Sequence, residues 1–203
     1  VSDLSVSSDN LTFTYEAKSL PYPIDTSYYD NEKHTQADAL SVIPFMDEMN
    51  YEGLSVSGLS DGYYGLTIGR EFIGRFTARE LERGINMALL QNTPQYKQAM
   101  KIRQMNEERW LKERKMREFY WVEYNLMRKT GMLWACNEAA VDTLRKYRPH
   151  DIFLQWNGDL WLQYMHKGIR EDCVNEQQDL VNQIYEQNKP IPLRIEIKKF
   201  TDL

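Results

Sequence analysis

Two periodicities of apolar residues divide the chain. In residues 4–15 and 54–76, apolar residues alternate with polar ones, which is typical of strands with one buried face. Polar residues 8–10 interrupt the first run and predict a hairpin turn. Turns at residues 61–62 and at Gly69 divide the second region, which therefore predicts three successive strands.

Helical signals follow the last of these strands. Thr77 and Glu80 have the spacing of a capping box and predict a short helix. After residue 90 the period lengthens to that of a helix, and Thr93 followed by Pro94 predicts its start, because proline is favourable at the first helical position. No Gly or Pro interrupts this predicted helix before Arg128.

The rest of the chain predicts shorter elements. Asn137 can cap a helix that ends near Tyr147, and residues 171–187 predict another helix. Residues 152–165 are rich in aromatics, and their secondary structure is ambiguous from the sequence. Residues 193–197 alternate again and predict a last strand.

The segment between the first hairpin and residue 53 predicts little regular structure. The Leu-Pro-Tyr-Pro sequence of residues 20–23 ends a strand or confines it to a sheet edge, because proline cannot donate to the ladder. Residues 25–39 are mostly polar and predict a long surface loop. Residues 40–45 form a short apolar run that Pro44 interrupts.

These elements predict an α+β fold. Because a lone strand is not stable, the last strand should return to pair with the N-terminal sheet. We therefore expect an antiparallel β-sandwich built from residues 1–92 and 190–203, and a long helical insertion formed by residues 93–189.

Composition narrows the classes of partner. The chain has 203 residues, a formal charge of −5 and a pI of about 5.3, and this balance does not support nucleic acid binding, which requires a dominant basic face. No apolar run approaches the length of a membrane span. Cys136 and Cys173 could form one disulfide or remain two packed thiols, but they do not predict a disulfide framework or a four-cysteine metal site.

Catalytic signatures are absent from the sequence. Nucleophilic hydrolysis needs a Ser or Cys, a base and oxyanion donors, and none of His34, His150 and His166 has a serine signature beside it. His150 and Asp151 are neighbours, but two potential ligands do not make a coordination sphere, and a solvated turn explains them. The sequence predicts no catalytic residue, no metal site and no cofactor.

Aromatic residues offer the one candidate for ligand binding. Trp156, Trp161 and Tyr164, together with Tyr28 and Tyr29, could stack on the apolar faces of sugar rings, with a carbohydrate or acylated glycan as partner. Packing in the core is the alternative. Self-association through the long helix is a further possibility, because a helix of this length exceeds the width of a small domain.

One stretch also carries a family resemblance. A series of glycine, apolar and capping residues runs through Asn50, Leu54, Val56, Gly58, Leu59, Gly62, Tyr64, Leu66, Ile68, Gly74, Phe76, Thr77, Glu80, Leu81, Gly84, Ile85, Asn86, Ala88 and Leu89. This series resembles the region that follows the catalytic domain in bacterial SGNH (GDSL-type) ester hydrolases. Residues 20–23, 147–149 and 189–192 look like later landmarks of that group in the same order, although Asp151 stands where the group typically has Asn.

The resemblance implies an accessory role. In SGNH hydrolases the nucleophile lies in a Gly-Asp-Ser block and the base in an Asp-x-x-His block, whereas residues 158–160 here read Gly-Asp-Leu, so no catalytic role is carried over. The chain looks like a noncatalytic C-terminal domain that packs on an N-terminal catalytic domain and could shape its cleft. The resemblance also implies export to the periplasm or the extracellular space, and a parent enzyme that hydrolyses acyl esters.

Overall fold

The computed structural model describes residues 1–7, 9–26 and 35–200. Tyr28, Tyr29 and His34 lie outside the described residues. The chain forms two compact units, one built from Val1–Arg103 with Gln187–Leu203 and the other from Gln104–Glu186. The sequence predicts domain boundaries after residues 92 and 189, and these boundaries stay predictions.

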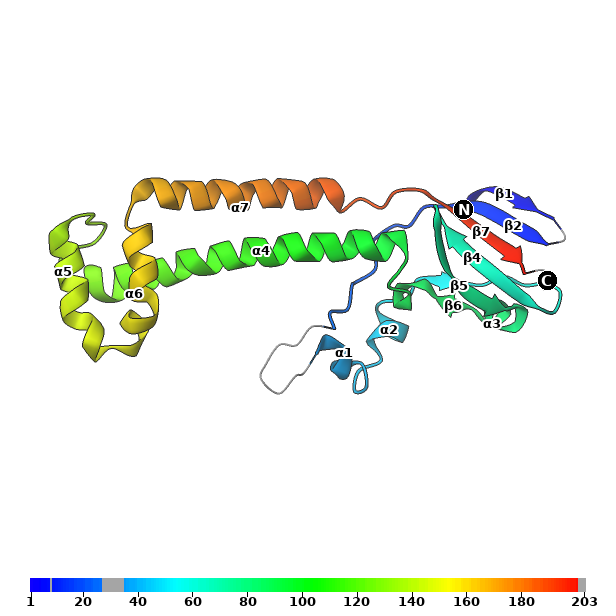
Figure 1. The fold of residues 1–203 in the computed structure, drawn as a ribbon, viewed down its shortest axis with the longest axis horizontal. Coiled ribbons are helices and arrows are strands. Elements are labelled where there is room, and N and C mark those ends of the chain that lie inside the picture. Colours follow the sequence, from blue (N-terminus) through cyan, green and yellow to red (C-terminus); the bar gives the residue numbers. More distant parts are fainter. Residues whose placement is uncertain (8, 27–34, 201–203) are drawn as a thin grey trace. The chain divides into compact units, whose positions relative to one another are not determined.

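A five-stranded antiparallel sheet organises the first unit (Figure 1). Its strands follow the order β1 (Ser2–Val6), β2 (Asn10–Tyr15), β7 (Leu193–Lys199), β4 (Tyr63–Ile68) and β5 (Glu71–Thr77). The last strand, red in Figure 1, pairs with β2 on one side and with β4 on the other. The predicted α+β class and the return of the last strand to the sheet are therefore confirmed.

One face of this sheet carries the core of the first unit. Ile195 and Ile197 of β7 are fully buried and lie beside Leu66 and Ile68 of β4 in the ladder. This alternation places every second residue on the same face. The layer that covers it contains α3 (Ala78–Arg83), the two-stranded sheet of β3 (Gly53–Leu54) and β6 (Ile85–Asn86), and the 3-10 helix Met87–Leu89.

The predicted sandwich is not confirmed, because the second sheet has only two short strands. Residues 54–59 alternate as a strand should, yet the strand ends at Leu54. Gly58 has a φ of 81°, which turns the chain away from extended geometry, and the Val56 N–H bonds to the carbonyl of Leu81 in α3 instead of a strand.

The segment before β3 is partly helical. Residues 36–39 form α1 (Gln36–Ala39), where Thr35 and Asp38 make a capping box that the expectation of a loop missed. The apolar run at 40–45 is a turn that leads into α2 (Phe45–Glu48), because Pro44 prevents an extended continuation and occupies the N-cap position.

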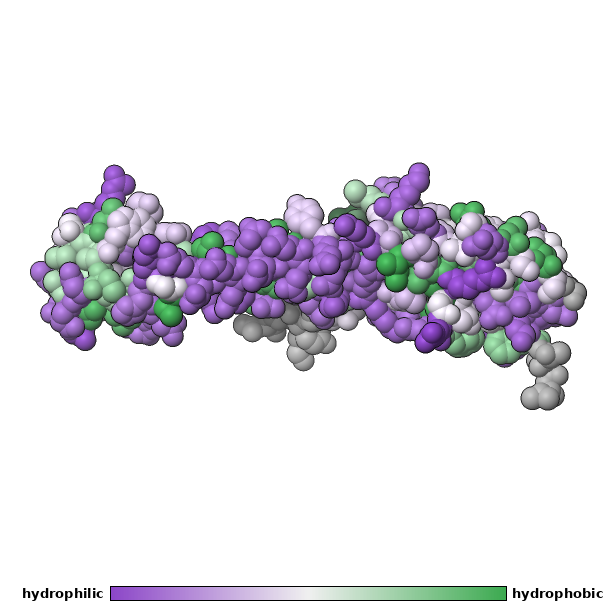
Figure 2. Space-filling model, turned by 90° about the horizontal axis from the view of Figure 1, so that it is seen from above, coloured by the Kyte–Doolittle hydropathy of each residue, from purple (hydrophilic) through white to green (hydrophobic). Residues whose placement is uncertain are grey.

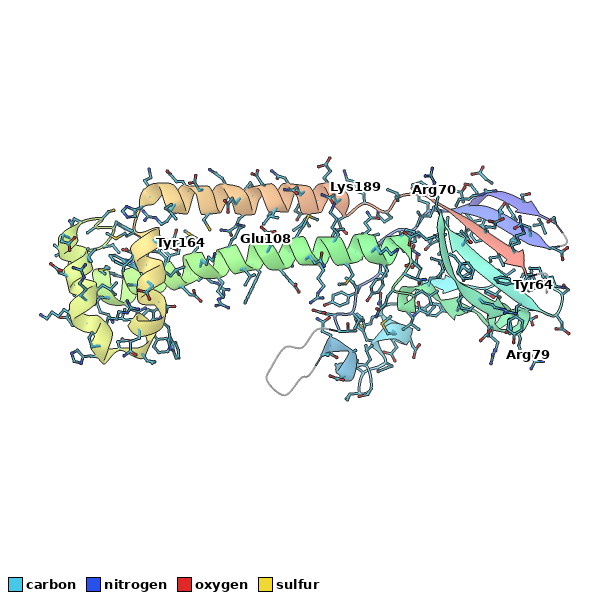
Figure 3. All side chains as sticks on the ribbon, viewed as in Figure 1. Tyr64, Arg70, Arg79, Glu108, Tyr164 and Lys189 are labelled. Atoms are coloured by element: carbon cyan, nitrogen blue, oxygen red, sulfur yellow. The ribbon has the colours of Figure 1, made fainter. Side chains whose placement is uncertain are left out.

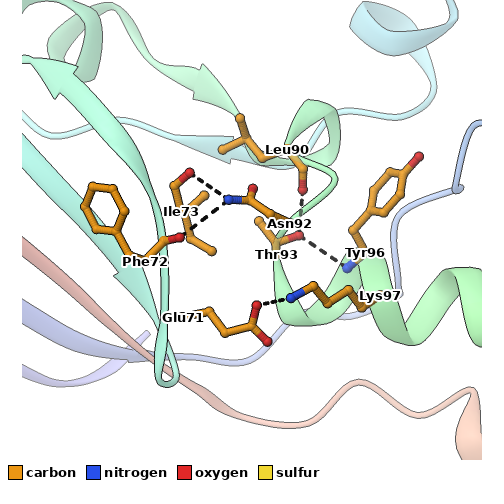
Figure 4. Close-up of polar contacts among 8 residues, drawn as sticks. All are labelled: Glu71, Phe72, Ile73, Leu90, Asn92, Thr93, Tyr96 and Lys97. Atoms are coloured by element: carbon orange, nitrogen blue, oxygen red, sulfur yellow. Dashed lines mark hydrogen bonds and ion pairs between the residues drawn. The ribbon is translucent and has the colours of Figure 1, made fainter.

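The start of α4 (Pro94–Val122) is fixed to the sheet of the first unit by polar contacts (Figure 4). The Asn92 side-chain amide donates to the carbonyl oxygen of Ile73 at 2.8 Å, and Lys97 pairs with Glu71. The Thr93 hydroxyl accepts a hydrogen bond from the backbone N–H three residues on. The predicted cap at this helix start is confirmed.

The second unit is entirely helical in its regular structure. After Val122 the long helix continues as a π-helical turn, Glu123–Met127, and is followed by α5 (Glu138–Tyr147), α6 (Ile152–Tyr164) and α7 (Lys167–Gln187). The ambiguous residues 152–165 thus form the helix α6 and its C-cap, Met165. Figure 2 shows the outward face of α7 as a mainly hydrophilic strip, which agrees with a helix buried along one side.

The core of the second unit joins α4, α5, α6 and α7. Phe119, Val122, Leu144 and Trp161 are among its most deeply buried apolar side chains. Both cysteines are free thiols, Cys173 buried in this core and Cys136 exposed. Of the two alternatives, a disulfide or two unpaired thiols, the structure therefore shows the second.

Candidate functional site

No catalytic triad forms among residues 1–7, 9–26 and 35–200. The nearest approach is an exposed contact in which the Nδ1 of His166 lies 3.3 Å from the Sγ of Cys136. A thiol and an imidazole supply a nucleophile and a base, but in the described part of the chain no side chain orients the other ring nitrogen of His166. Sequence reasoning missed this pair because the two residues are distant in sequence.

Metal and membrane chemistry also find no support in the described residues. Nowhere in them do three or more His, Cys, Asp or Glu side chains gather at a distance that could hold a metal ion. No helix among the described residues combines the length and the apolar character that a bilayer crossing demands.

The three aromatic residues predicted to bind a ligand do not share a surface. Trp161 is fully buried, and its indole N–H donates to the Oε1 of Glu123 at 2.8 Å. Tyr164, labelled in Figure 3, is also buried, and burial raises the pKa of its phenol to about 12. Only Trp156 is open to solvent, with 67% of its surface exposed. Trp161 and Tyr164 instead pack in the core of the second unit, which was the alternative interpretation.

Trp156 instead belongs to a different set of rings, which we call the aromatic ladder: Trp121, Phe153 and Trp156. The ring centroids of Trp121 and Phe153 lie 5.2 Å apart, and those of Phe153 and Trp156 lie 5.5 Å apart. Both separations are typical of interacting aromatic pairs. Phe153 and Trp156 are three residues apart on α6, so their shared face was readable from the sequence. Trp121 comes from α4, and no local signal connects it to them.

A cavity of about 350 Å³ adjoins the aromatic ladder within the second unit. Trp121 lines this cavity, so it belongs to the ladder and to the cavity wall. Its polar lining comes from several elements. Asn125 lies in the π-helical turn, Lys129 in the turn after it and Tyr147 at the end of α5, while His150 lies in the 3-10 helix Arg148–His150 and Asp151 caps α6. We call this space the ladder cavity.

Asp151 also positions the ladder through the backbone. Its Oδ1 accepts from the N–H of Phe153 at 2.8 Å and from that of Leu154 at 3.3 Å, so it caps α6. Arg148 makes a bidentate pair with Asp159, 2.7 Å for each contact. An added Cβ at Gly158 would lie 3.2 Å from the Arg148 side chain. The Gly-Asp pair at 158–159 is therefore structural, because its glycine makes room for the guanidinium that its aspartate binds.

Glu123 fixes a second group of surface aromatics. This fully buried carboxylate accepts from the backbone N–H of Trp134 at 2.8 Å, in addition to the indole of Trp161. Trp134 has a φ of 62°, which bulky residues rarely adopt. Its ring lies about 6 Å from the rings of Tyr120 and Tyr124. The carboxylate thus holds a strained turn that presents Trp134 beside these two tyrosines.

The first unit has a polar cavity of about 410 Å³ lined by Tyr15, Glu52 and the residues of the 20–22 turn. Burial raises the pKa of Glu52, and hydrogen bonds from Gln95 and Tyr15 oppose this shift. Burial, and then the charge of Glu52, raise the pKa of Tyr15 to about 12. The Nε2 of Gln95 lies 3.4 Å from each oxygen of Glu52, while its buried Oε1 has no hydrogen-bond partner in the described structure.

A third, mainly apolar cavity of about 400 Å³ opens beside the edge strand of the sheet. Leu4 of β1 and Val1 line it, and they are 63% and 83% exposed. Phe13, Leu54 and Met87 of the adjoining core form its floor. We call this space, with the β1 side chains beside it, the edge groove. Exposed apolar side chains beside an unpaired strand edge form a surface that proteins often cover.

Comparisons with known proteins place these features in context. Residues 100–189 match the family model described as the diltiazem deacetylase C-terminal helical domain. A solved structure described as a gut microbial diltiazem-metabolizing enzyme is similar to this chain with 36% sequence identity and a TM-score of 0.91. The similarity covers 98% of this chain and 45% of that one, so the chain spans less than half of the length of that enzyme. The search of curated proteins finds no match.

These similarities support the coarser part of the predicted resemblance. The helical unit is similar to a domain that its family model describes as C-terminal in a deacetylase, and nearly all of this chain has a counterpart in a solved enzyme. The SGNH type of the enzyme, its export and its partners stay predictions.

Proposed function

We propose that this chain is a noncatalytic C-terminal accessory domain of an ester hydrolase of the SGNH type, with the catalytic domain outside the present sequence. One observation carries the proposal: the similarity covers nearly all of this chain but less than half of a solved diltiazem-metabolizing enzyme. The family model points to the same chemistry, because a deacetylase removes an acetyl group. As in SGNH hydrolases, the whole protein would be exported.

The edge groove is the surface that would pack on the catalytic domain. Leu4 and Val6 are 63% and 70% exposed, and both side chains are apolar. The groove beside them has an apolar floor that water solvates poorly. Covering these side chains would remove an unpaired strand edge and an apolar patch together, which favours a permanent partner within the same polypeptide.

Hydrolysis of p-nitrophenyl acetate tests this function. We expect the present chain to show no turnover above buffer, and the longer protein that contains it to hydrolyse the ester and to be inhibited by a serine-directed fluorophosphonate. Cys136→Ser and His166→Ala are the matched controls, because they remove the one thiol–imidazole pair found in the described residues.

Two results would contradict the proposal. Saturable hydrolysis by the present chain would show that it carries its own catalytic residues, and loss of that activity in the Cys136→Ser variant would identify the thiol as the nucleophile. A longer protein that resists the serine-directed inhibitor while remaining active would refute the SGNH type of the parent enzyme.

A further inference from the structure

The aromatic ladder exposes large ring surfaces to water. Phe153 is 48% exposed and Trp156 is 67% exposed, and both project from one face of α6. The ring planes of Trp121 and Phe153 differ by 37° and those of Phe153 and Trp156 by 79°, so the three rings form a strip of adjoining apolar faces and edges. Among the described residues the strip has no covering segment, so the exposure is a cost that a ligand lying on the strip would remove.

The ladder cavity supplies polar groups that are not used within the protein. Lys129 and His150 make no side-chain hydrogen bond or ion pair to any described residue. Asn125 donates to the carbonyl of Trp121, which leaves its Oδ1 as an acceptor. Asp151 uses Oδ1 to cap α6 and keeps Oδ2 available. The cavity therefore offers donors and acceptors side by side.

This combination selects among classes of ligand. An apolar partner would cover the rings but leave Lys129, His150 and the Oδ2 of Asp151 desolvated without hydrogen bonds, which is unfavourable. A simple anion would meet Lys129 but also the carboxylate of Asp151. A sugar ring has an apolar face for an aromatic ring and hydroxyl groups that both donate and accept, so it matches both parts of the site.

We propose that the aromatic ladder and the ladder cavity together form a saccharide-binding site, in which one sugar ring stacks on Trp121 and its hydroxyl groups bond Asn125, His150 and Asp151. Further sugar units extend along Phe153 and Trp156. A cavity of about 350 Å³ is within the size range of small-molecule sites. The binding does not depend on the proposed accessory function, because no residue of the edge groove or of a catalytic domain takes part.

Calorimetric titration of the full 203-residue chain with soluble oligosaccharides tests the site. The probes are cellohexaose, xylohexaose, mannohexaose, maltohexaose and chitohexaose. At least one of them is expected to bind the unaltered chain. Trp156→Ala removes an exposed ring and should weaken that binding about tenfold, the loss of one stacking contact. His150→Ala removes one polar group of the cavity and should weaken it severalfold.

Trp110→Ala is the matched control, because Trp110 is a half-exposed indole on α4 that does not line the ladder cavity. The Trp110→Ala variant should bind the oligosaccharide as tightly as the unaltered chain does. Circular dichroism should show that each variant keeps its helical content. The proposal is overturned if none of the five oligosaccharides binds. It is also overturned if the Trp156→Ala variant binds as tightly as the unaltered chain. Ester hydrolysis is not part of this readout, so failure here leaves the proposed accessory function standing.

Discussion

Glu52 lines the polar cavity of the first unit, and the burial of its carboxyl group there lowers the stability of the fold at neutral pH. Its carboxylate lies beside Gln95, whose buried Oε1 has no partner in the described structure, and beside the phenol of Tyr15. Burial raises the pKa of Glu52. A carboxyl group with a raised folded-state pKa contributes most to stability below its unfolded pKa, about 4.3, and loses that contribution as pH rises through the folded value.

Replacing Glu52 by Gln should therefore stabilise the chain at neutral pH. The Glu52→Gln substitution removes the buried charge, and its amide can donate to the Oε1 of Gln95, so the free energy of unfolding at pH 7 should rise by about 1 kcal/mol. The gain should shrink on acidification to pH 4. Urea unfolding at both pH values measures it, and Glu48→Gln, at an exposed position, serves as the control. A gain that grows toward pH 4 would contradict this account.

At the scale of elements, three of the helix caps that lie within one helical turn were predicted from the sequence, whereas the Thr35–Asp38 capping box of α1 was missed. The Thr77 capping box, the Thr93 cap before Pro94 and the Asn137 cap of α5 all appear in the structure. Each depends on residues three positions apart, so tertiary context changes it little. The hairpins and the last strand were also readable, because alternation marks their buried faces.

Predictions that needed distant contacts failed or could not be made. The strand expected at 54–59 ends at Leu54, because α3 rather than a strand provides its next partner. The aromatic ladder joins Trp121 to Phe153, and the exposed thiol contact joins Cys136 to His166, each across a long stretch of sequence. Propensity and periodicity contain no information about such pairs.

The capping box of α3 gives a prediction at this scale. The Thr77 hydroxyl accepts from the N–H of Glu80 at 3.1 Å, and the Glu80 carboxylate accepts from Thr77 in return. Thr77→Ala should lower the free energy of unfolding by about 1 kcal/mol, while Thr77→Ser should keep most of it. Thermal unfolding followed by circular dichroism compares them. Equal melting temperatures for the two variants would show that the hydroxyl does not stabilise the helix start.

At the scale of the whole molecule, the proposed packing on a catalytic domain predicts an effect that only the longer protein can show. Leu4→Asp places a charge in the edge groove at a position that is 63% exposed here. In the present chain the substitution should change the melting temperature little. In the longer protein it should lower the temperature at which esterase activity is lost by several degrees, because the charge would be buried without a partner.

Val42→Asp provides the comparison for that experiment. Val42 is 81% exposed and does not line the edge groove, so a charge there should leave both proteins unchanged. If Leu4→Asp and Val42→Asp behave alike in the longer protein, the catalytic domain does not cover the edge groove. Light scattering on the present chain would separately measure the self-association expected from the long helix, whose Trp110 and Leu111 are about half-exposed.

The central place of β7 has a consequence for how the polypeptide matures. Synthesis releases the β1–β2 and β4–β5 hairpins long before Leu193, yet neither hairpin has its inner neighbour until residues 193–199 arrive. Until then the edges of β2 and β4 that β7 covers are unpaired, and either could pair with a strand of another nascent chain. A chain terminated just before Leu193 should consequently accumulate as inclusion bodies, even though it would retain every helix.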